Sequence, residues 1–379
     1  MTDRTEVRPF RIDIPQETLD DLADRLARVR WTDDAPSDGY GVSTDEVKAL
    51  VAYWKDGYDW RRWENKLNEY PQYTTDIDGQ NIHFLHVRSP EPDAFPLVLT
   101  HGWPGSIVEF LDIISPLTDP AAHGGDPADA FHLVIPSLPG YGFSGPTTDT
   151  GWNTPRTAAA WVELMRRLGY QHYGAAGNDA GSMISPAIGR LDPAHVAGVH
   201  VTQVFSFPSG DPAEFADLSA EDLAALGKLQ WFMDNKFAFN QLQSQQPQTL
   251  AHALADSPAG LLGWNLQLMA ADAMGGNALD ADFILTNTAI YWVTNTAGSS
   301  IRLYYEDART PPAPAEPTTV PLALAGFAGD FSGIRRFAER DHHNLLQWNL
   351  YDTPGGHYAA HTAPDVLSTD LRDFYRKLR

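Results

Sequence analysis

The sequence predicts an α/β protein with a mostly parallel sheet, helices on both faces of that sheet, a helical cap insertion and an N-terminal extension. Segments with the pattern of buried strands alternate with amphipathic helical segments, which is typical of parallel sheets covered by crossover helices. A long stretch rich in helical patterns and aromatic residues interrupts this alternation. Hydrophobic residues make up 43% and charged residues 20% of the 379 residues, as expected for a folded protein with a sizeable core.

The individual elements follow from the spacing of apolar residues. Amphipathic helices are expected at Gln16–Arg30 and Val42–Gly57, where apolar residues recur at helical spacing among charged ones. Strands are expected where short apolar runs are bounded by turn residues, at Asn81–Val87, Leu97–Thr100, Phe131–Ile135, Tyr173–Ala176, His200–Phe205, Val320–Leu324 and Leu345–Tyr351. Further helices are expected at Ala158–Leu168, Ser182–Leu191 and Asp365–Leu378.

The same patterns divide the chain. Residues 1–92 form the expected N-terminal extension. Residues 93–208 and 301–379 form the expected α/β core, because the strand patterns lie there. From Ser209 to Thr296 helical segments predominate with few strand signals, so residues 209–300 are expected to form the helical cap.

Composition limits the partners and the location. Lys and Arg number 27 against 49 Asp and Glu, and a net charge of −22 repels phosphate backbones and anionic membranes. We therefore expect no nucleic-acid partner. The absence of cysteine excludes disulfides, a thiol nucleophile and a Cys-ligated zinc site. The sequence begins without a signal-peptide pattern and contains no run of about 18 apolar residues, so we expect no membrane partner and a cytoplasmic location.

The strongest chemical signal is the run Gly177-Asn178-Asp179-Ala180-Gly181, between a predicted strand and a predicted helix. It has the layout of a nucleophile elbow, with aspartate at the position where esterases carry serine. An aspartate on this turn can attack an electrophilic carbon and form an ester that water must cleave, which suits epoxides and alkyl halides. Taken alone, the pattern also fits an ordinary turn or helix cap.

A second motif, His101–Gly105, follows the predicted strand Leu97–Thr100. α/β-Hydrolases build half of their oxyanion hole on this loop, so the backbone N–H groups of Trp103 and Ala180 are expected to face a developing oxyanion. Its occurrence together with the elbow, in the expected chain order, favours this interpretation over a plain Pro/Gly turn.

The general base is expected near the C-terminus. His357 lies on a glycine loop after the last predicted strand, where this fold places its base, although an exposed loop histidine is the alternative. A carboxylate after the preceding strand should orient its imidazole. Asp330 is the preferred candidate, with Asp341 and Asp352 as alternatives, and Asp330 could instead cap a helix.

Opening an epoxide creates an alkoxide, so a proton donor opposite the nucleophile lowers the barrier. Tyr304, at the end of the helical insertion, is the candidate because a phenol is protonated at neutral pH. Tyr305 beside it either packs or contributes to substrate binding, and Trp103 and Phe239 are expected to line the substrate site.

At these residues the sequence resembles the microsomal-type epoxide hydrolases, including their bacterial and fungal members, over essentially its whole length. Within Phe10–Ser89, three stretches are similar to the family's N-terminal domain, RLARVRW, YWKDGYDWR and DGQNIHFLHVRS. Similar motifs follow at His101–Pro104, Pro136–Gly145 and Gly355–Ala360. The resemblance implies an α/β-hydrolase fold, no metal or organic cofactor, and four roles: nucleophile Asp179, base His357, orienting acid Asp330 and proton donor Tyr304.

Two positions depart from the family pattern. Ala180 stands where the family usually carries tryptophan after the nucleophile, which enlarges the site. Phe239 occupies the position of a second cap tyrosine and cannot donate a proton. Ring opening would then depend on Tyr304 alone or on a nearby polar group such as Gln241 or Gln243.

The expected function is hydrolysis of a small hydrophobic epoxide to a vicinal diol, with water as the second substrate, and a homodimer is left open. One alternative is haloalkane dehalogenase chemistry, against which Ala180 and the N-terminal match argue. The other is a catalytically silent α/β-hydrolase that binds a hydrophobic ligand, which the missing tyrosine motivates. His342 and His343 are not taken as metal ligands, because no third histidine stands at a recognisable spacing.

Overall fold

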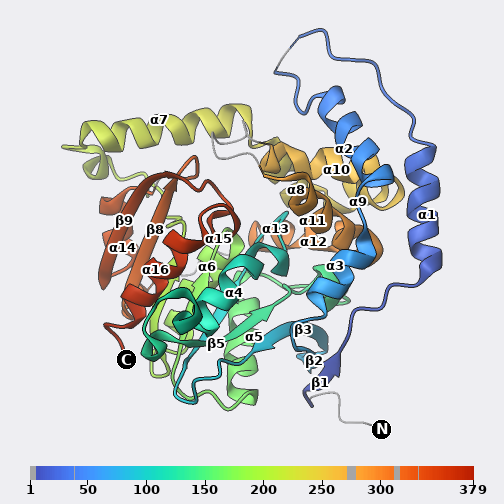
Figure 1. Ribbon diagram of the computed structural model, residues 1–379. Helices are drawn as coiled ribbons and strands as arrows, with labels where there is room; N and C mark the ends of the chain where they lie inside the picture. Colours follow the sequence, from blue (N-terminus) through green and yellow to red (C-terminus); the bar gives the residue numbers. More distant parts are fainter. Residues whose placement is uncertain (1–5, 38, 271–278, 311–315, 332) are drawn as a thin grey trace.

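The computed structural model describes residues 6–379 except 38, 271–278, 311–315 and 332, and it has the α/β-hydrolase arrangement of a central sheet between helical layers (Figure 1). Within these residues the sheet has nine strands, in the order β1-β2-β3-β5-β4-β6-β7-β8-β9. Their bounds are β1 Arg8–Phe10, β2 Gln72–Ile77, β3 Gln80–Val87, β4 Phe95–Thr100, β5 Phe131–Pro136, β6 Tyr173–Gly177, β7 Val196–Val201, β8 Leu322–Ala328 and β9 Leu345–Pro354. From β5 to β9 in that order the strands run parallel, whereas β1, β2 and β3 pair antiparallel.

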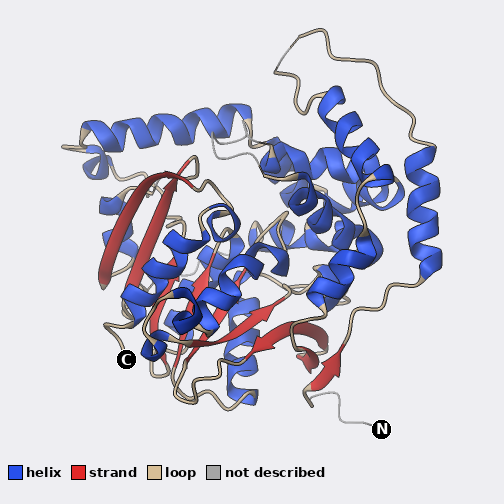
Figure 2. Cartoon of the chain, in the orientation of Figure 1, coloured by secondary structure: helices blue, strands red, loops and turns tan. Residues whose placement is uncertain are grey.

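Helices connect the parallel strands and cover both faces of the sheet (Figure 2). Those before the cap region are α1 Gln16–Ala27, α2 Thr44–Asp56, α3 Trp60–Leu67, α4 Leu111–Thr118, α5 Thr154–Arg167 and α6 Ala180–Leu191. The next are α7 Ala220–Asn235, α8 Ala238–Gln245, α9 Pro247–Asp256, α10 Pro258–Met269, α11 Ala281–Val293, α12 Ala297–Ser300 and α13 Arg302–Asp307. The last are α14 Arg335–Asp341, α15 Ala359–Thr362 and α16 Pro364–Tyr375.

The two faces of the sheet belong to two hydrophobic clusters, because side chains alternate along a strand. Leu97 and Leu99 of β4 pack with the cluster of α4 and α16, whereas Val98 packs with the cluster of α5 and α6. All three side chains are almost fully buried. This two-sided burial explains why the central strands read as continuous apolar runs.

The N-terminal helices pack against the helical region rather than against the parallel strands. Helices α1 and α2 contact α10, and α2 and α3 contact α11. Polar contacts reinforce this packing: Arg25 donates to the Asp256 carbonyl (2.7 Å), and the Tyr53 hydroxyl donates to Asp282 (2.8 Å). None of the helices in the described ranges is long and apolar enough to cross a membrane.

Two expectations about the strands were wrong. The strand expected at His200–Phe205 is β7, which begins at Val196 and ends at Val201, because its ladder partners in β6 and β8 pair with this segment and not with the residues after Val201. Two further strands were not predicted, because neither has an apolar run: β1 is a three-residue edge strand, and β2, between β1 and β3, is largely polar. The division into extension, core and cap stays a prediction, although β1–β3 of the expected extension join the same sheet as the core.

Candidate active site

A sharp turn between β6 and α6 presents Asp179. Its backbone adopts φ 53° and ψ −117°, a conformation that residues other than glycine rarely adopt and that stores strain. The flanking glycines permit the turn. A Cβ on Gly177 would lie 2.4 Å from the Gly181 backbone, and one on Gly181 would lie 1.9 Å from the Thr100 carbonyl oxygen. The glycine spacing seen in the sequence is therefore a steric requirement of this bend.

One oxygen of the Asp179 carboxylate is held by the loop after β4. The Trp103 N–H donates to Oδ1 at 3.0 Å. Gly102 allows this approach, because a Cβ there would lie 2.1 Å from the same oxygen. Ala180 is the first residue of α6, so its N–H has no acceptor within the helix. These are the two backbone donors that the sequence analysis expected at the oxyanion hole.

The second carboxylate oxygen faces His357. The Nε2 atom of His357 lies 3.7 Å from Asp179 Oδ2, and its Nδ1 lies 3.0 Å from Asp330 Oδ1. Burial disfavours the imidazolium, but the Asp330 carboxylate and then the Asp179 carboxylate outweigh it and raise the pKa of His357 to about 9. Of the two alternative acids, Asp341 pairs with Arg340 instead. Asp352 lies exposed on β9.

The raised pKa of His357 predicts a pH-dependent stability. Because the pKa in the folded protein is about 9 against an ordinary 6.5, the stabilisation from the charged imidazole is fully present below pH 6.5 and is lost as the pH rises through about 9. We expect the Tm of the unmodified chain to fall over this window by more than the Tm of His357→Gln. Parallel Tm profiles of the two proteins would contradict the assignment.

Three aromatic side chains from separate parts of the chain form a wall beside the nucleophile. The Trp103 and Phe239 rings stack with centroids 5.7 Å apart. Tyr304, on α13, stands edge-on to both rings with centroids 6.0 Å from each. Burial and then the negative charge of Asp179 raise the pKa of Tyr304 well above its ordinary value. Its phenol therefore keeps its proton throughout the neutral range and can donate it.

Tyr305 does not join this group. The Arg309 guanidinium lies over its ring, 3.5 Å from the centroid, so its observed partner is a surface cation. Of the two glutamines considered as substitute donors, Gln241 is exposed, and Gln243 is buried with its amide oxygen accepting a hydrogen bond from the Trp264 indole at 2.9 Å. Tyr304 is thus the expected donor that the structure places beside Trp103 and Phe239.

Glu109 is a buried acid that the sequence analysis missed. It lies in the short helix η1 (Ile107–Phe110) after the His101–Gly105 loop, is 1% exposed, and has the Asn178 side chain as a polar neighbour. Burial raises the pKa of Glu109 to about 8, against the opposing effect of the nearby His357 charge. The group is therefore largely a neutral acid at pH 7, and no motif in the sequence signals this.

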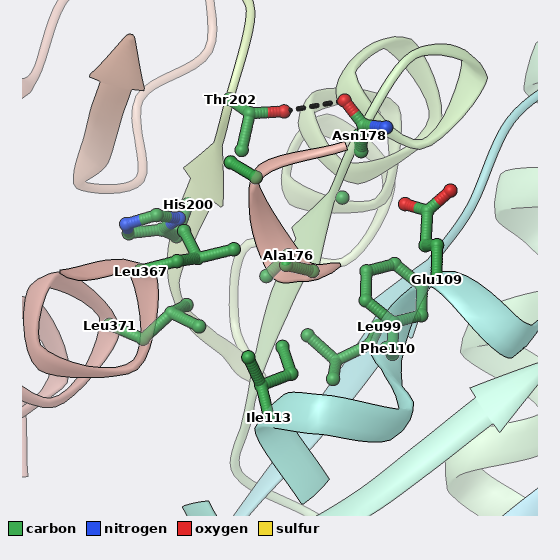
Figure 3. Close-up of a pocket in the computed structure, with 13 residues that line it drawn as sticks. Leu99, Glu109, Phe110, Ile113, Ala176, Asn178, His200, Thr202, Leu367 and Leu371 are labelled. Atoms are coloured by element: carbon green, nitrogen blue, oxygen red, sulfur yellow. Dashed lines mark hydrogen bonds between the residues drawn. The ribbon is translucent and has the colours of Figure 1, made fainter. Parts of the chain in front are cut away.

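Glu109 lines a small cavity on the α4 and α16 side of the sheet, behind the elbow (Figure 3). Leu367 and Leu371 of α16 close one end of it, and Glu109 and Asn178 lie toward the other. The Asn178 amide oxygen accepts a hydrogen bond from Thr202 at 2.8 Å. A buried carboxylic acid and an amide at the edge of an apolar space can hold a water molecule.

Comparisons with known proteins show which family and which structures the chain is similar to. The family model described as "Epoxide hydrolase N terminus" matches residues 7–110, and the model "alpha/beta hydrolase fold" matches residues 96–271. A protein of Stigmatella aurantiaca named provisionally as an epoxide hydrolase is 43% identical over 98% of this chain and 86% of its own length. The Aspergillus niger epoxide hydrolase structure superposes with a TM-score of 0.86 at 30% identity, covering 100% of this chain and 98% of that chain. The Bombyx mori juvenile hormone epoxide hydrolase structure gives a TM-score of 0.89 at 26% identity, covering 99% and 96%.

Proposed function

This chain belongs to the epoxide hydrolase family of the α/β-hydrolase superfamily and is an epoxide hydrolase, and we propose that it forms a vicinal diol through a covalent ester on Asp179. One observation carries the mechanism. The Asp179 carboxylate has one oxygen on the Trp103 N–H and the other 3.7 Å from the His357 imidazole. The free edge of the nucleophile thus faces the base that must later activate water.

In the first step, Asp179 Oδ2 attacks an epoxide carbon. The new carbon–oxygen bond forms as the ring carbon–oxygen bond breaks, and its electron pair moves to the epoxide oxygen. Tyr304 supplies the proton that turns this oxygen into a hydroxyl group, leaving a phenolate. Oδ1 stays on the Trp103 N–H and becomes the ester carbonyl oxygen.

In the second step, His357 removes a proton from water, and the hydroxide attacks the Asp179 carboxyl carbon. Ester formation removes the Asp179 charge, which is one of the charges that raise the pKa of His357, so the imidazolium of the free enzyme loses its proton to solvent more easily and becomes the neutral base. The Trp103 and Ala180 N–H groups stabilise the tetrahedral oxyanion on Oδ1. The diol leaves with the proton from His357, and the remaining carboxylic proton returns to the Tyr304 phenolate.

A single turnover in oxygen-18 water tests the covalent route. With enzyme in excess over a styrene oxide-type epoxide, label is expected in the Asp179 carboxylate and not in the first diol, because water attacks the carboxyl carbon. Mass spectrometry of the peptide that contains Asp179 and of the diol measures both, and Asp179→Asn serves as the control. Label that enters the diol directly in the first turnover would contradict the ester.

We also propose a substrate class, a cellular location, an oligomeric state and a domain division. The aromatic wall of Trp103, Phe239 and Tyr304 supports a small hydrophobic epoxide as substrate. A panel of aliphatic and aromatic epoxides tests this preference. The cytoplasmic location, a homodimer, and the division into extension, core and cap belong to the same proposal.

Phe239 favours a second candidate function, because its ring occupies the wall without a hydroxyl group. A chain with weakened ring opening could bind a hydrophobic ligand without turning it over. Tight binding of an epoxide that is recovered unchanged would support this candidate, and diol formation excludes it. Dehalogenase chemistry, for which Ala180 offers no side-chain donor, is decided by measuring halide release from alkyl halides.

A further inference from the structure

Gln203 connects two of the segments that carry the proposed catalytic groups, the elbow at Asp179 and the loop that carries Asp330. It follows β7, and its side chain is completely buried. Its amide oxygen accepts from the Asp179 backbone N–H at 2.8 Å and from the Ser182 hydroxyl at 2.9 Å. Its amide nitrogen donates to Asn178 Oδ1 at 2.7 Å and to Asp330 Oδ2. These four bonds use the whole hydrogen-bonding capacity of a glutamine amide.

Each bond constrains a different part of the site. Asp330 Oδ2 accepts from Gln203, and Oδ1 remains for His357 Nδ1. Both carboxylate oxygens are therefore hydrogen-bonded, which fixes the plane of the carboxylate relative to the imidazole. The bond from the Asp179 N–H supports the strained elbow, whose φ of 53° needs surrounding contacts to persist. A buried and fully satisfied amide is suited to this task, because reorienting it would break several bonds at once.

We propose that Gln203 is a positioning residue for ester hydrolysis, acting through Asp330 on the orientation of His357. This inference rests on the proposed Asp179 ester. The bond to a carboxylate is charge-assisted and buried, so its loss should affect the step that needs a correctly oriented, chargeable imidazole. Attack by Asp179 on the epoxide does not need that imidazole as a base. Gln203 should therefore influence the second step more than the first.

Gln203→Met tests the proposal, because methionine has nearly the volume of glutamine but no amide. We expect ester hydrolysis to slow about ten- to a hundredfold, so that kcat falls and the ester accumulates, while ester formation slows by less, because the first step depends on Gln203 only through the elbow contacts. Rapid-quench mass spectrometry of the Asp179 peptide measures both steps. Thr202→Val is the matched control: it removes a buried hydrogen bond to Asn178 from the adjacent residue without touching Asp330. It is expected to leave the hydrolysis rate within about twofold.

A double-mutant cycle separates positioning from mere packing. If Gln203 acts through Asp330, Gln203→Met should add little to the defect of Asp330→Ala, because alanine has no oxygen to accept from the Gln203 amide and the interaction is already lost. If the reductions in hydrolysis rate of the two single variants multiply in the double variant, the proposal is overturned. A Gln203→Met hydrolysis rate equal to that of Thr202→Val would also overturn it. If Gln203→Met fails to fold, Gln203→Glu keeps the acceptor for the Asp179 N–H but sets a carboxyl group against Asp330, and the same accumulation of ester is expected.

The wild-type measurement distinguishes the two possible failures. An unmodified chain that turns over without any Asp179 ester would refute the proposed covalent function. An unmodified chain that forms the ester, with Gln203→Met hydrolysing it at the normal rate, would refute only the role of Gln203.

Discussion

His357→Gln is expected to stop the reaction at the covalent intermediate. Asp179 needs no general base to attack the epoxide, so one equivalent of ester should form at close to the normal rate. Hydrolysis of that ester should slow by about 10³- to 10⁴-fold, because the variant has no imidazole 3.7 Å from the reacting carboxyl group to take a proton from water. The kinetic signature is a burst of one equivalent of epoxide consumed without a matching amount of diol.

The mass of the covalent intermediate can be measured directly. Intact-protein mass spectrometry should show His357→Gln heavier by the mass of the epoxide, and fragmentation should place the adduct on Asp179. His343→Gln is the matched control, because His343 is exposed on a loop outside the site and its variant should turn over normally. Continued diol formation by His357→Gln at the normal rate would show that another group activates the water.

The order of the motifs made much of the site predictable from the sequence. An elbow needs glycines on both sides for steric reasons, and the structure gives those reasons as close approaches at Gly177 and Gly181. A loop histidine after the last strand and an acid after the preceding strand must meet at one edge of a parallel sheet, because the strands point the same way. The structure accordingly places Asp330 and His357 within hydrogen-bonding distance.

Glu109 and Gln203 could not be recognised in the same way. Their surroundings arise only when segments far apart in the chain come together: Glu109 is affected by His357, and Gln203 contacts Asp330 across 127 positions of sequence. Neither stands in a motif with a known chemical meaning. Their importance depends on burial and on partners, which a sequence pattern does not encode.

The sequence patterns also could not predict which surface the N-terminal helices pack against. An amphipathic helix shows which face it buries but not which surface covers it. The apolar faces of α1 and α2 could have packed on the sheet as readily as on α10. The long-range contacts of Arg25 with Asp256 and of Tyr53 with Asp282 occur at surfaces where the sequence shows only common charged and polar residues.

Tyr304 and Tyr305 offer a matched pair of substitutions. Neighbouring residues on a helix point about 100° apart, so only one of the two can face the nucleophile. Tyr304→Phe should slow ester formation by about 10²- to 10⁴-fold, because it removes the proton donor while keeping the ring against Trp103. Tyr305→Phe makes the same chemical change beside Arg309 and should leave turnover within about twofold.

Phe239→Tyr tests proton donation by adding a hydroxyl group instead of removing one. Its ring already stacks on Trp103 and meets Tyr304 edge-on, so an added hydroxyl would place a second phenol in the same aromatic wall. We expect faster ester formation in the otherwise unmodified chain and partial recovery in combination with Tyr304→Phe. Pre-steady-state rates of ester formation measure both effects. If Tyr304→Phe reacts normally and Tyr305→Phe does not, the proton donor lies on the other side of α13 and the aromatic wall only shapes the substrate site.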